Sequence, residues 1–291
     1  MSKRASGFLL VFAAATLWST SGLFIRWTAA GSGASALSLA FWRDLATFVS
    51  LLVGLALFRP AWLRVARRDL PWLAALGAVG VGTFHVLWNL TILRLGYGVA
   101  TILLYTSPAF VAVMARLLWG EPLTRFKGLA VALTLAGCIL MTGREELVGS
   151  ALTVGGLLLG LSAALAYGSF NLFGRQVARR YPPWTVLVYG FGFGALALLP
   201  FQFRAALPWP LAAQTWVWFA GLVLIATLIP FGLYMAALRR LPVSIASILA
   251  TSEILLGALV GYFLFGERLG GWQILGGILV VSGVAIIALR S

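Results

Sequence analysis

Two short stretches, LLWGEPL at residues 117–123 and FLFGERL at residues 263–269, each carry a Gly-Glu pair after a run of apolar residues. A shift of 146 positions brings Gly120-Glu121 onto Gly266-Glu267. Without gaps, the same shift pairs Leu95 with Leu241, Ala100 with Ala246, Thr106 with Ser252, and Trp72 with Trp218. Such an internal repeat indicates two copies of one structural unit. We therefore expect one unit over residues 1–146 and a second over residues 147–291.

The composition indicates that both units lie in a membrane. Of the 291 residues, 62% are hydrophobic and 10% are charged, and the mean hydropathy is +1.01. A soluble domain is nearer half apolar and about a quarter charged, and even a large one must cover its surface with polar groups. The same figures exclude a disordered chain. The single cysteine, Cys138, excludes an intramolecular disulfide and a cysteine-cluster metal site.

Long apolar segments predict the membrane spans, since a helix needs about 20 apolar residues to cross the bilayer. Ten such segments run approximately over residues 8–27, 35–58, 71–93, 98–119, 128–143, 153–175, 184–202, 214–237, 243–265 and 272–290. Their unbroken apolar character differs from the alternation of a membrane β-barrel. The apolar stretch of the first segment is too long for a cleaved signal peptide. Pro108 and Pro230 lie inside spans, where each can bend its helix.

Each unit thus holds five spans, and an odd number makes the second unit enter the membrane from the opposite side. We expect an all-α integral membrane protein with ten transmembrane helices arranged as two inverted five-helix repeats. This architecture is typical of secondary transporters, whose binding site lies near the midplane of the bilayer. The pair Gly190 and Gly194 permits close helix packing. We expect that packing within one chain, which favours a monomer but leaves a dimer open.

The basic residues predict the orientation. With the N-terminus in the cytoplasm, the inner connections carry Lys3, Arg4, Arg59, Arg64, Arg67, Arg68, Arg125, Lys127, Arg175, Arg179, Arg180, Arg239, Arg240 and Arg290. The outer connections then carry only Arg26, Arg94, Arg144, Arg204 and Arg268. Basic residues prefer cytoplasmic loops, so both termini are expected in the cytoplasm. Because these residues sit in short gaps between apolar runs, the net charge of +14 does not indicate nucleic-acid binding.

Three stretches resemble a known family. The segment AALRRLPV at residues 236–243, together with the two Gly-Glu stretches, resembles the drug/metabolite transporter superfamily of the EamA type, and the fit covers all ten spans. Among its members, the chain looks most like bacterial exporters of aromatic and other hydrophobic amino acids. The resemblance implies a basket of ten helices, alternating access, and export of small metabolites across the bacterial inner membrane.

Polar side chains inside spans are expensive in lipid and normally face a cavity or a partner. In the third span His85, Trp88 and Asn89 follow the i, i+3, i+4 spacing of one helical face. His85 is the only histidine. Three roles stay open for it: lining a substrate cavity, a structural hydrogen bond to another helix, or proton coupling.

Aromatic residues with polar tips gather near the centres of other spans. They are Trp18, Tyr105, Tyr167 and Tyr234, with Asn171 on the same face as Tyr167. Such side chains suit a cavity for an amphipathic molecule, and their rings attract an ammonium group. The alternative for each is ordinary helix packing. Seven tryptophans at span ends instead fit the interfacial belt, namely Trp62, Trp72, Trp184, Trp209, Trp216, Trp218 and Trp272.

Two charged residues lie deep in the expected spans. Glu253 must be protonated, paired or in contact with water, so proton coupling, a structural hydrogen bond and contact with a substrate ammonium all stay open. Arg43 could bind a substrate carboxylate, snorkel outward or pair with an acid on another helix; its neighbour Asp44 points elsewhere on the helix. Glu121 and Glu267, placed symmetrically at span ends, are expected to tie helix ends together.

We therefore expect a secondary transporter that exports small amphipathic metabolites, foremost aromatic or other hydrophobic amino acids, through a central aromatic-lined cavity. The expected partners are this substrate and membrane lipid, with no cofactor or metal. A carrier of phosphorylated metabolites or nucleotide sugars is an alternative, but it would want several basic residues at the midplane. An integral membrane enzyme would need a cluster of ionisable groups, and no HExxH, GxSxG or P-loop pattern occurs. A channel is a further alternative.

Overall fold

A computed structural model describes residues 3–142, 153–202, 212–265 and 270–290, and all regular secondary structure in these ranges is helical. Eight stretches are long and apolar enough to cross a membrane, and two shorter apolar helices cover Val243–Leu259 and Gly271–Ile287. The all-helical membrane fold is thus confirmed, whereas the count of ten spans stays a prediction. The second Gly-Glu pair, Gly266-Glu267, lies outside the described residues, as do Arg144, Arg204, Trp209 and Arg268.

Half of the expected spans form single helices close to the predicted bounds. They are α3 (Ala36–Phe58), α8 (Arg125–Thr142), α10 (Val154–Ala178), α11 (Pro183–Gln202) and α16 (Gly271–Arg290). The proline inside one of these helices, Pro200, lies near the end of α11.

Three expected spans consist of two helices each, because the helix is broken near the middle of the span. The broken pairs are α1 (Lys3–Trp18) with α2 (Ser21–Ser32), α6 (Tyr97–Leu104) with α7 (Ser107–Trp119), and α14 (Val243–Ala250) with α15 (Glu253–Phe265). A threonine hydroxyl at each break donates to the carbonyl oxygen three residues earlier, from Thr20 to Leu17, Thr106 to Leu103, and Thr251 to Ile248, at 2.6–2.7 Å. These local bonds satisfy backbone oxygens that the interrupted helix leaves free.

Two further spans contain π-helical segments. The third span consists of α4 (Leu70–Ala75), η3 (Leu76–Thr83) and α5 (Phe84–Leu95), and the eighth of α12 (Ala213–Val223), η4 (Leu224–Leu228) and α13 (Ile229–Leu238). Pro230 is the second residue of α13, directly after η4, and Pro108 is the second residue of α7, after the break at Thr106. In the first turn of α7 a proline removes no hydrogen bond, because the N–H there has no intrahelical partner.

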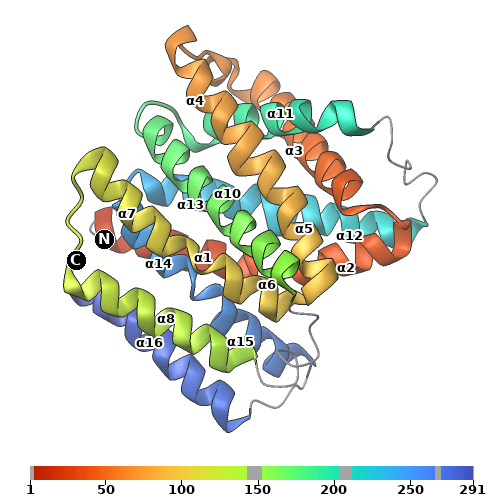
Figure 1. Cartoon of the computed structure of the whole chain (residues 1–291). Coiled ribbons are helices and arrows are strands. Elements are labelled where there is room, and N and C mark those ends of the chain that lie inside the picture. Colours follow the sequence, from red (N-terminus) through yellow and green to blue (C-terminus); the bar gives the residue numbers. More distant parts are fainter. Residues whose placement is uncertain (1–2, 143–152, 203–211, 266–269, 291) are drawn as a thin grey trace.

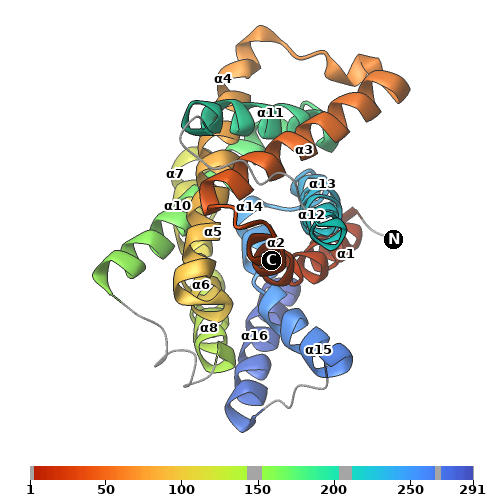
Figure 2. The ribbon, with the colours of Figure 1, turned by 90° about the vertical axis from the view of Figure 1, so that its right-hand side faces the viewer.

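The helices form a bundle in which α8 and α16 pair along one side, while α3, α11 and α4 form the opposite side (Figures 1 and 2). Between them lie α1, α13 and α14, with α10 packed against α5 and η3. Short 3₁₀ turns, η1 (Pro60–Leu63) and η2 (Arg67–Asp69), connect α3 to α4.

Glycines bring the backbones together at two crossings. A Cβ at Gly137 of α8 would lie 2.6 Å from the carbonyl oxygen of Gly276 of α16, and a Cβ at Gly276 would lie 2.7 Å from that of Gly137. On α11, a Cβ at Gly190 would meet Leu76 at 2.5 Å, and one at Gly194 would approach the backbone of η3. The expected packing of Gly190 and Gly194 within one chain is confirmed.

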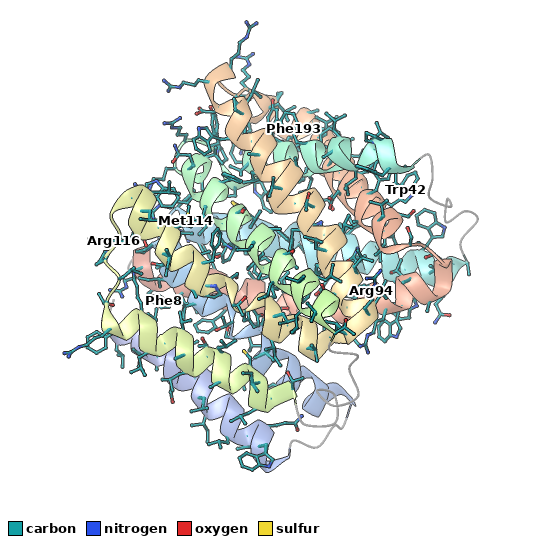
Figure 3. The ribbon with its side chains drawn as sticks, in the orientation of Figure 1. Phe8, Trp42, Arg94, Met114, Arg116 and Phe193 are labelled. Atoms are coloured by element: carbon teal, nitrogen blue, oxygen red, sulfur yellow. The ribbon has the colours of Figure 1, made fainter. Side chains whose placement is uncertain are left out.

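Both chain ends lie at the same end of the bundle, beside the connection from α7 to α8 (Figure 1). Exposed Arg116 also lies at this end, whereas Arg94 lies at the opposite end (Figure 3).

Asp69 accepts hydrogen bonds from Arg180 and, at 2.7 Å, from the Tyr181 hydroxyl. This bond to Asp69 raises the pKa of Tyr181. The contacts join the connection before α4 to the one after α10.

Candidate functional site

A small cavity lies where the broken and π-helical spans meet. It is lined by Trp18, Ser21, Arg43, Phe84, Trp88, Leu104, Tyr167, Phe231 and Glu253. The room for the centres of water molecules is about 20 Å³, which is about what one water molecule needs. The walls of this central cavity must therefore move apart before an organic molecule can enter.

Aromatic rings form most of the wall. The ring of Trp18, at the end of α1, contacts Phe231 edge to face with centroids 5.2 Å apart, and Tyr167 in the same manner at 6.4 Å. Phe84 stacks on Trp88 at 6.2 Å and lies 5.2 Å from Tyr167. Edge-to-face and offset contacts are the preferred geometries of aromatic pairs. The result is a wall of flat apolar surfaces drawn from α1, α5, α10 and α13.

Glu253 supplies the negative charge of the cavity. The break at Thr251-Ser252 makes it the first residue of α15, where the positive end of the helix dipole favours a carboxylate. One carboxylate oxygen accepts a hydrogen bond from the Tyr97 hydroxyl and the other from the Tyr105 hydroxyl, each at 2.8 Å. These bonds and the helix terminus compensate for burial of a carboxylate that is only 6% exposed.

Arg43 supplies the positive charge from α3. Its Nε donates to Thr227 Oγ1 at 2.6 Å, and Nη2 donates to the carbonyl oxygen of Ala226 at 3.4 Å. Both acceptors belong to the π-helical segment η4, one through a side-chain hydroxyl and the other through a backbone oxygen. With 2% exposure, Arg43 does not snorkel. Its Nη1 has no hydrogen-bond partner among the described residues, so one face of the guanidinium is left for a ligand.

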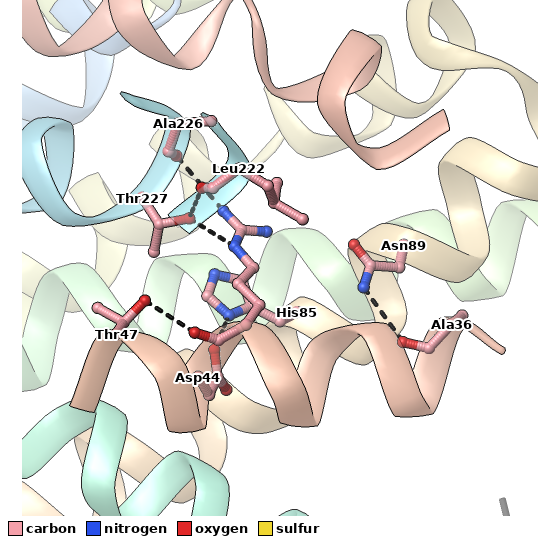
Figure 4. A network of polar contacts seen from close by, with 9 residues as sticks. Ala36, Asp44, Thr47, His85, Asn89, Leu222, Ala226 and Thr227 are labelled. Atoms are coloured by element: carbon pink, nitrogen blue, oxygen red, sulfur yellow. Dashed lines mark hydrogen bonds and ion pairs between the residues drawn. The ribbon is translucent and has the colours of Figure 1, made fainter. Parts of the chain in front are cut away.

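His85 pairs with Asp44, an acid that the sequence did not identify as its partner. Its Nδ1 is 2.5 Å from Oδ1 of Asp44, and neither side chain is exposed (Figure 4). As expected, Asp44 is not the hydrogen-bond partner of Arg43. Its carboxylate instead contacts His85 of α5. The other atoms of the pair, Asp44 Oδ2 and His85 Nε2, have no hydrogen-bond partner within the described ranges. The pair is a fully buried polar group beside the cavity wall.

The remaining predicted residues lie outside the wall. Asn89 donates to the carbonyl oxygen of Ala36 at 3.1 Å, which ties α5 to the start of α3. Asn171 donates to the carbonyl oxygen of Tyr167 at 2.7 Å and accepts a hydrogen bond from Tyr234. Together with Tyr105, these residues contact wall residues or hold the surrounding helices.

The sequence therefore placed Trp18, Arg43, Trp88, Tyr167 and Glu253 at what proves to be one cavity. It missed four wall residues, Ser21, Phe84, Leu104 and Phe231. Phe84 lies four residues before Trp88, and this spacing on one helical face was the available signal. Nothing distinguished Leu104 or Phe231 from other apolar residues of the spans.

Once its walls have moved apart, the chemistry of the cavity suits a molecule with opposite charges and an apolar part. Arg43 and Glu253 provide a cation and an anion, and the aromatic rings provide apolar area between them. Across the parts of the chain that the structure describes, no three His, Cys, Asp or Glu side chains group as metal ligands would.

Comparison with known proteins places the chain among transporters. An "Uncharacterized transporter" of Archaeoglobus fulgidus is 30% identical over 286 residues, which cover 96% of this chain and 95% of that protein. The "Probable terminal-alkyne amino-acid exporter" of Streptantibioticus cattleyicolor is 28% identical and covers 94% of this chain and 90% of its own. A solved crystal structure superposes with a TM-score of 0.79 over 98% of this chain and 97% of its own, at 22% identity, and so shares the fold.

The profile of the EamA-like transporter family matches twice, over residues 5–143 and 154–289. These two matches cover nearly the whole chain. The chain therefore belongs to the EamA-like transporter family, within the drug/metabolite transporter superfamily.

Proposed function

We propose that the protein exports small amphipathic metabolites, foremost aromatic and other hydrophobic amino acids, across the bacterial inner membrane. The observation that carries the proposal is the presence of Arg43, Glu253 and five aromatic rings around one cavity. A guanidinium suits a carboxylate, a carboxylate suits an ammonium, and aromatic faces suit both an apolar side chain and a cation. The relative named as a probable amino-acid exporter supports this substrate class.

Phosphorylated metabolites fit the cavity less well. Arg43 is the one basic residue among the described wall residues, and two of its donors are already bound to Thr227 and Ala226. A phosphate would meet the carboxylate of Glu253 in the same small space. We therefore place carriers of nucleotide sugars second. An enzyme is not favoured, since the family is one of transporters.

Alternating access by two inverted repeats, residues 1–146 and 147–291, is the proposed mechanism. A shift of 146 brings the helix break at Tyr105-Thr106 onto the break at Thr251-Ser252, and it brings η3 over η4. The two family matches support the same division. Broken helices around a midplane site are what this class of carrier uses to move one repeat against the other.

The orientation that we propose has both termini in the cytoplasm. The end of the bundle that holds the chain ends also holds Arg116, Lys127 and Arg175. Basic residues favour the cytoplasmic side. Export then means that the substrate enters from this end.

Counterflow in liposomes tests the proposal. Vesicles that contain the purified protein are loaded with unlabelled L-phenylalanine and diluted into a trace of the labelled compound. A carrier gives a transient uptake that saturates and depends on the internal amino acid, whereas a channel gives no overshoot. Parallel vesicles loaded with a nucleotide sugar are expected to give no counterflow. Overshoot with the nucleotide sugar alone would reverse the order of the two candidates.

A further inference from the structure

A second cavity lies at the end of the bundle that holds both chain ends. The connection from α7 to α8, the last turns of α10 and the first turn of α14 surround it. Its volume is about 370 Å³, against about 20 Å³ for the central cavity. Ligand sites in proteins occupy roughly 300–1,000 Å³. Its rim includes the exposed residues Pro122 and Thr124, so it opens at the surface.

Three charged side chains form the floor of this cavity. Glu121 pairs with Arg175 and accepts a hydrogen bond from Ser244 at 2.5 Å, which ties α10 and α14 to the α7–α8 connection as the sequence predicted. Arg175 also lies over the ring of Trp119, 4.6 Å from its centroid. One oxygen of Glu121 thus pairs with Arg175 and the other accepts from Ser244, while the guanidinium also contacts an aromatic ring.

Lys127 is the exception. Its side chain is 9% exposed, and Nζ forms an ion pair with Glu121 Oε2 at 3.7 Å, a separation beyond hydrogen-bond distance. Within the described ranges this is the one polar contact of the ammonium. Two cations and one carboxylate leave a net positive charge beside the apolar walls of Phe126 and Ile245. A cation that is held by one long ion pair and lines an open apolar cavity is a feature of an anion-binding site.

We propose that this cavity is a second substrate site, in which Lys127 binds the carboxylate of an amphipathic amino acid while Phe126 and Ile245 contact its apolar part. The inference rests on the proposed function, which gives the substrate class and makes this end cytoplasmic. An exporter collects its substrate from the cytoplasm, and a site at this end concentrates it at the entrance. Ile245 belongs to α14, and the eight residues of this helix span about 12 Å before the break that precedes Glu253. One half-helix thus connects the two cavities.

Cysteine labelling tests this site directly. The one native cysteine, Cys138, is buried and can be replaced by alanine, and Pro122→Cys then places a unique thiol on the cavity rim. In phosphatidylcholine liposomes, saturating L-phenylalanine should slow maleimide labelling of this thiol at least fivefold. Lys127→Met in the same background should abolish the protection without changing the labelling rate in the absence of phenylalanine. Arg116→Met, which removes an exposed cation at the same end, should leave the protection intact.

These experiments distinguish a wrong proposal for the second site from a wrong proposal for the transport function. Phenylalanine counterflow without protection, or protection that survives Lys127→Met, would overturn the second site alone. Protection without any counterflow would support the site and overturn the transport proposal. Trp18→Ala, in the central cavity, should lose counterflow and keep the protection. Protection by phosphatidylglycerol liposomes alone, with no effect of phenylalanine in phosphatidylcholine, would assign the cavity to a lipid headgroup and overturn the proposal.

Discussion

Arg43, in the second expected span, and Glu253, in the ninth, line one central cavity with opposite charges. Each charge is held in place by its own neighbours: Arg43 by Thr227 of η4, and Glu253 by the hydroxyls of Tyr97 and Tyr105. Residues of the two repeats thereby meet at the proposed substrate site.

The aromatic wall should be essential for transport and dispensable for insertion. Trp18→Ala and Tyr167→Ala each remove a ring that contacts the cavity, and we expect kcat/KM to fall at least tenfold, or about 1.4 kcal/mol. Trp272→Ala is the matched control, because this side chain is 71% exposed. Counterflow is measured at equal amounts of membrane-inserted protein. Equal losses at the wall and at Trp272 would remove the evidence for an aromatic substrate cavity.

Glu253 should act in binding and not in proton coupling. The described wall offers no chain of acids and histidines that continues from Glu253 to either surface, as proton relays require. In Glu253→Gln, we expect the maximal flux to stay within about threefold of the wild type, with KM raised about tenfold, a loss of about 1.4 kcal/mol. The measurement is phenylalanine uptake with and without an imposed pH gradient. Accumulation driven by the gradient in the wild type and lost in this variant would make Glu253 the coupling acid.

His85 and Asp44 should be energetically coupled. Removing one member leaves the other buried without its partner, which lowers the free energy of unfolding by about 3 kcal/mol. In the double variant Asp44→Ala/His85→Ala no unpaired group remains, so its loss should be smaller than the sum of the two single losses. Thermal unfolding of the four proteins in detergent gives the comparison. Strictly additive losses would show that the 2.5 Å contact carries no coupling.

The crossing of α8 and α16 should depend on Gly137. A Cβ there would lie 2.6 Å from the Gly276 carbonyl oxygen, so Gly137→Ala should lower the Tm by several degrees. Gly128 is the control on the same helix, because a Cβ there meets nothing within 4 Å. Gly128→Ala should leave the Tm unchanged or raise it, since alanine is about 1 kcal/mol better in helices. An equal Tm for both variants would contradict the close backbone contact.

The positions of the spans could be read from the sequence because an apolar run of bilayer length is seldom anything but a membrane-spanning helix. The predicted segments 35–58 and 184–202 correspond to Ala36–Phe58 and Pro183–Gln202. The breaks were missed because hydropathy does not register them. Their signal is a pair of hydroxyl residues at mid-span, Ser19-Thr20, Thr106-Ser107 and Thr251-Ser252. Their hydroxyls donate to carbonyl oxygens three positions earlier, which compensates for the backbone bonds that the interrupted helix lacks.

The sequence predicted which residues form the candidate site better than it predicted which residues they contact. Burial of a charge in lipid is costly, so Arg43 and Glu253 stood out in the sequence. The partner of His85 did not, because a contact between α3 and α5 depends on how two helices are packed. Periodicity within one helix gives the face of His85, but it does not say which residue of another helix that face meets.

The most direct test of the central claim is competition between phenylalanine and two analogues that each lack one charge. Phenylpropionate keeps the carboxylate, and phenethylamine keeps the ammonium. In the wild type, phenylalanine should inhibit labelled phenylalanine counterflow at least tenfold more strongly than either analogue. In Glu253→Gln, the advantage over phenylpropionate should shrink to within about twofold, because the partner of the ammonium is gone, while the advantage over phenethylamine should remain. An unchanged preference for phenylalanine over phenylpropionate in Glu253→Gln would contradict recognition of the ammonium by Glu253.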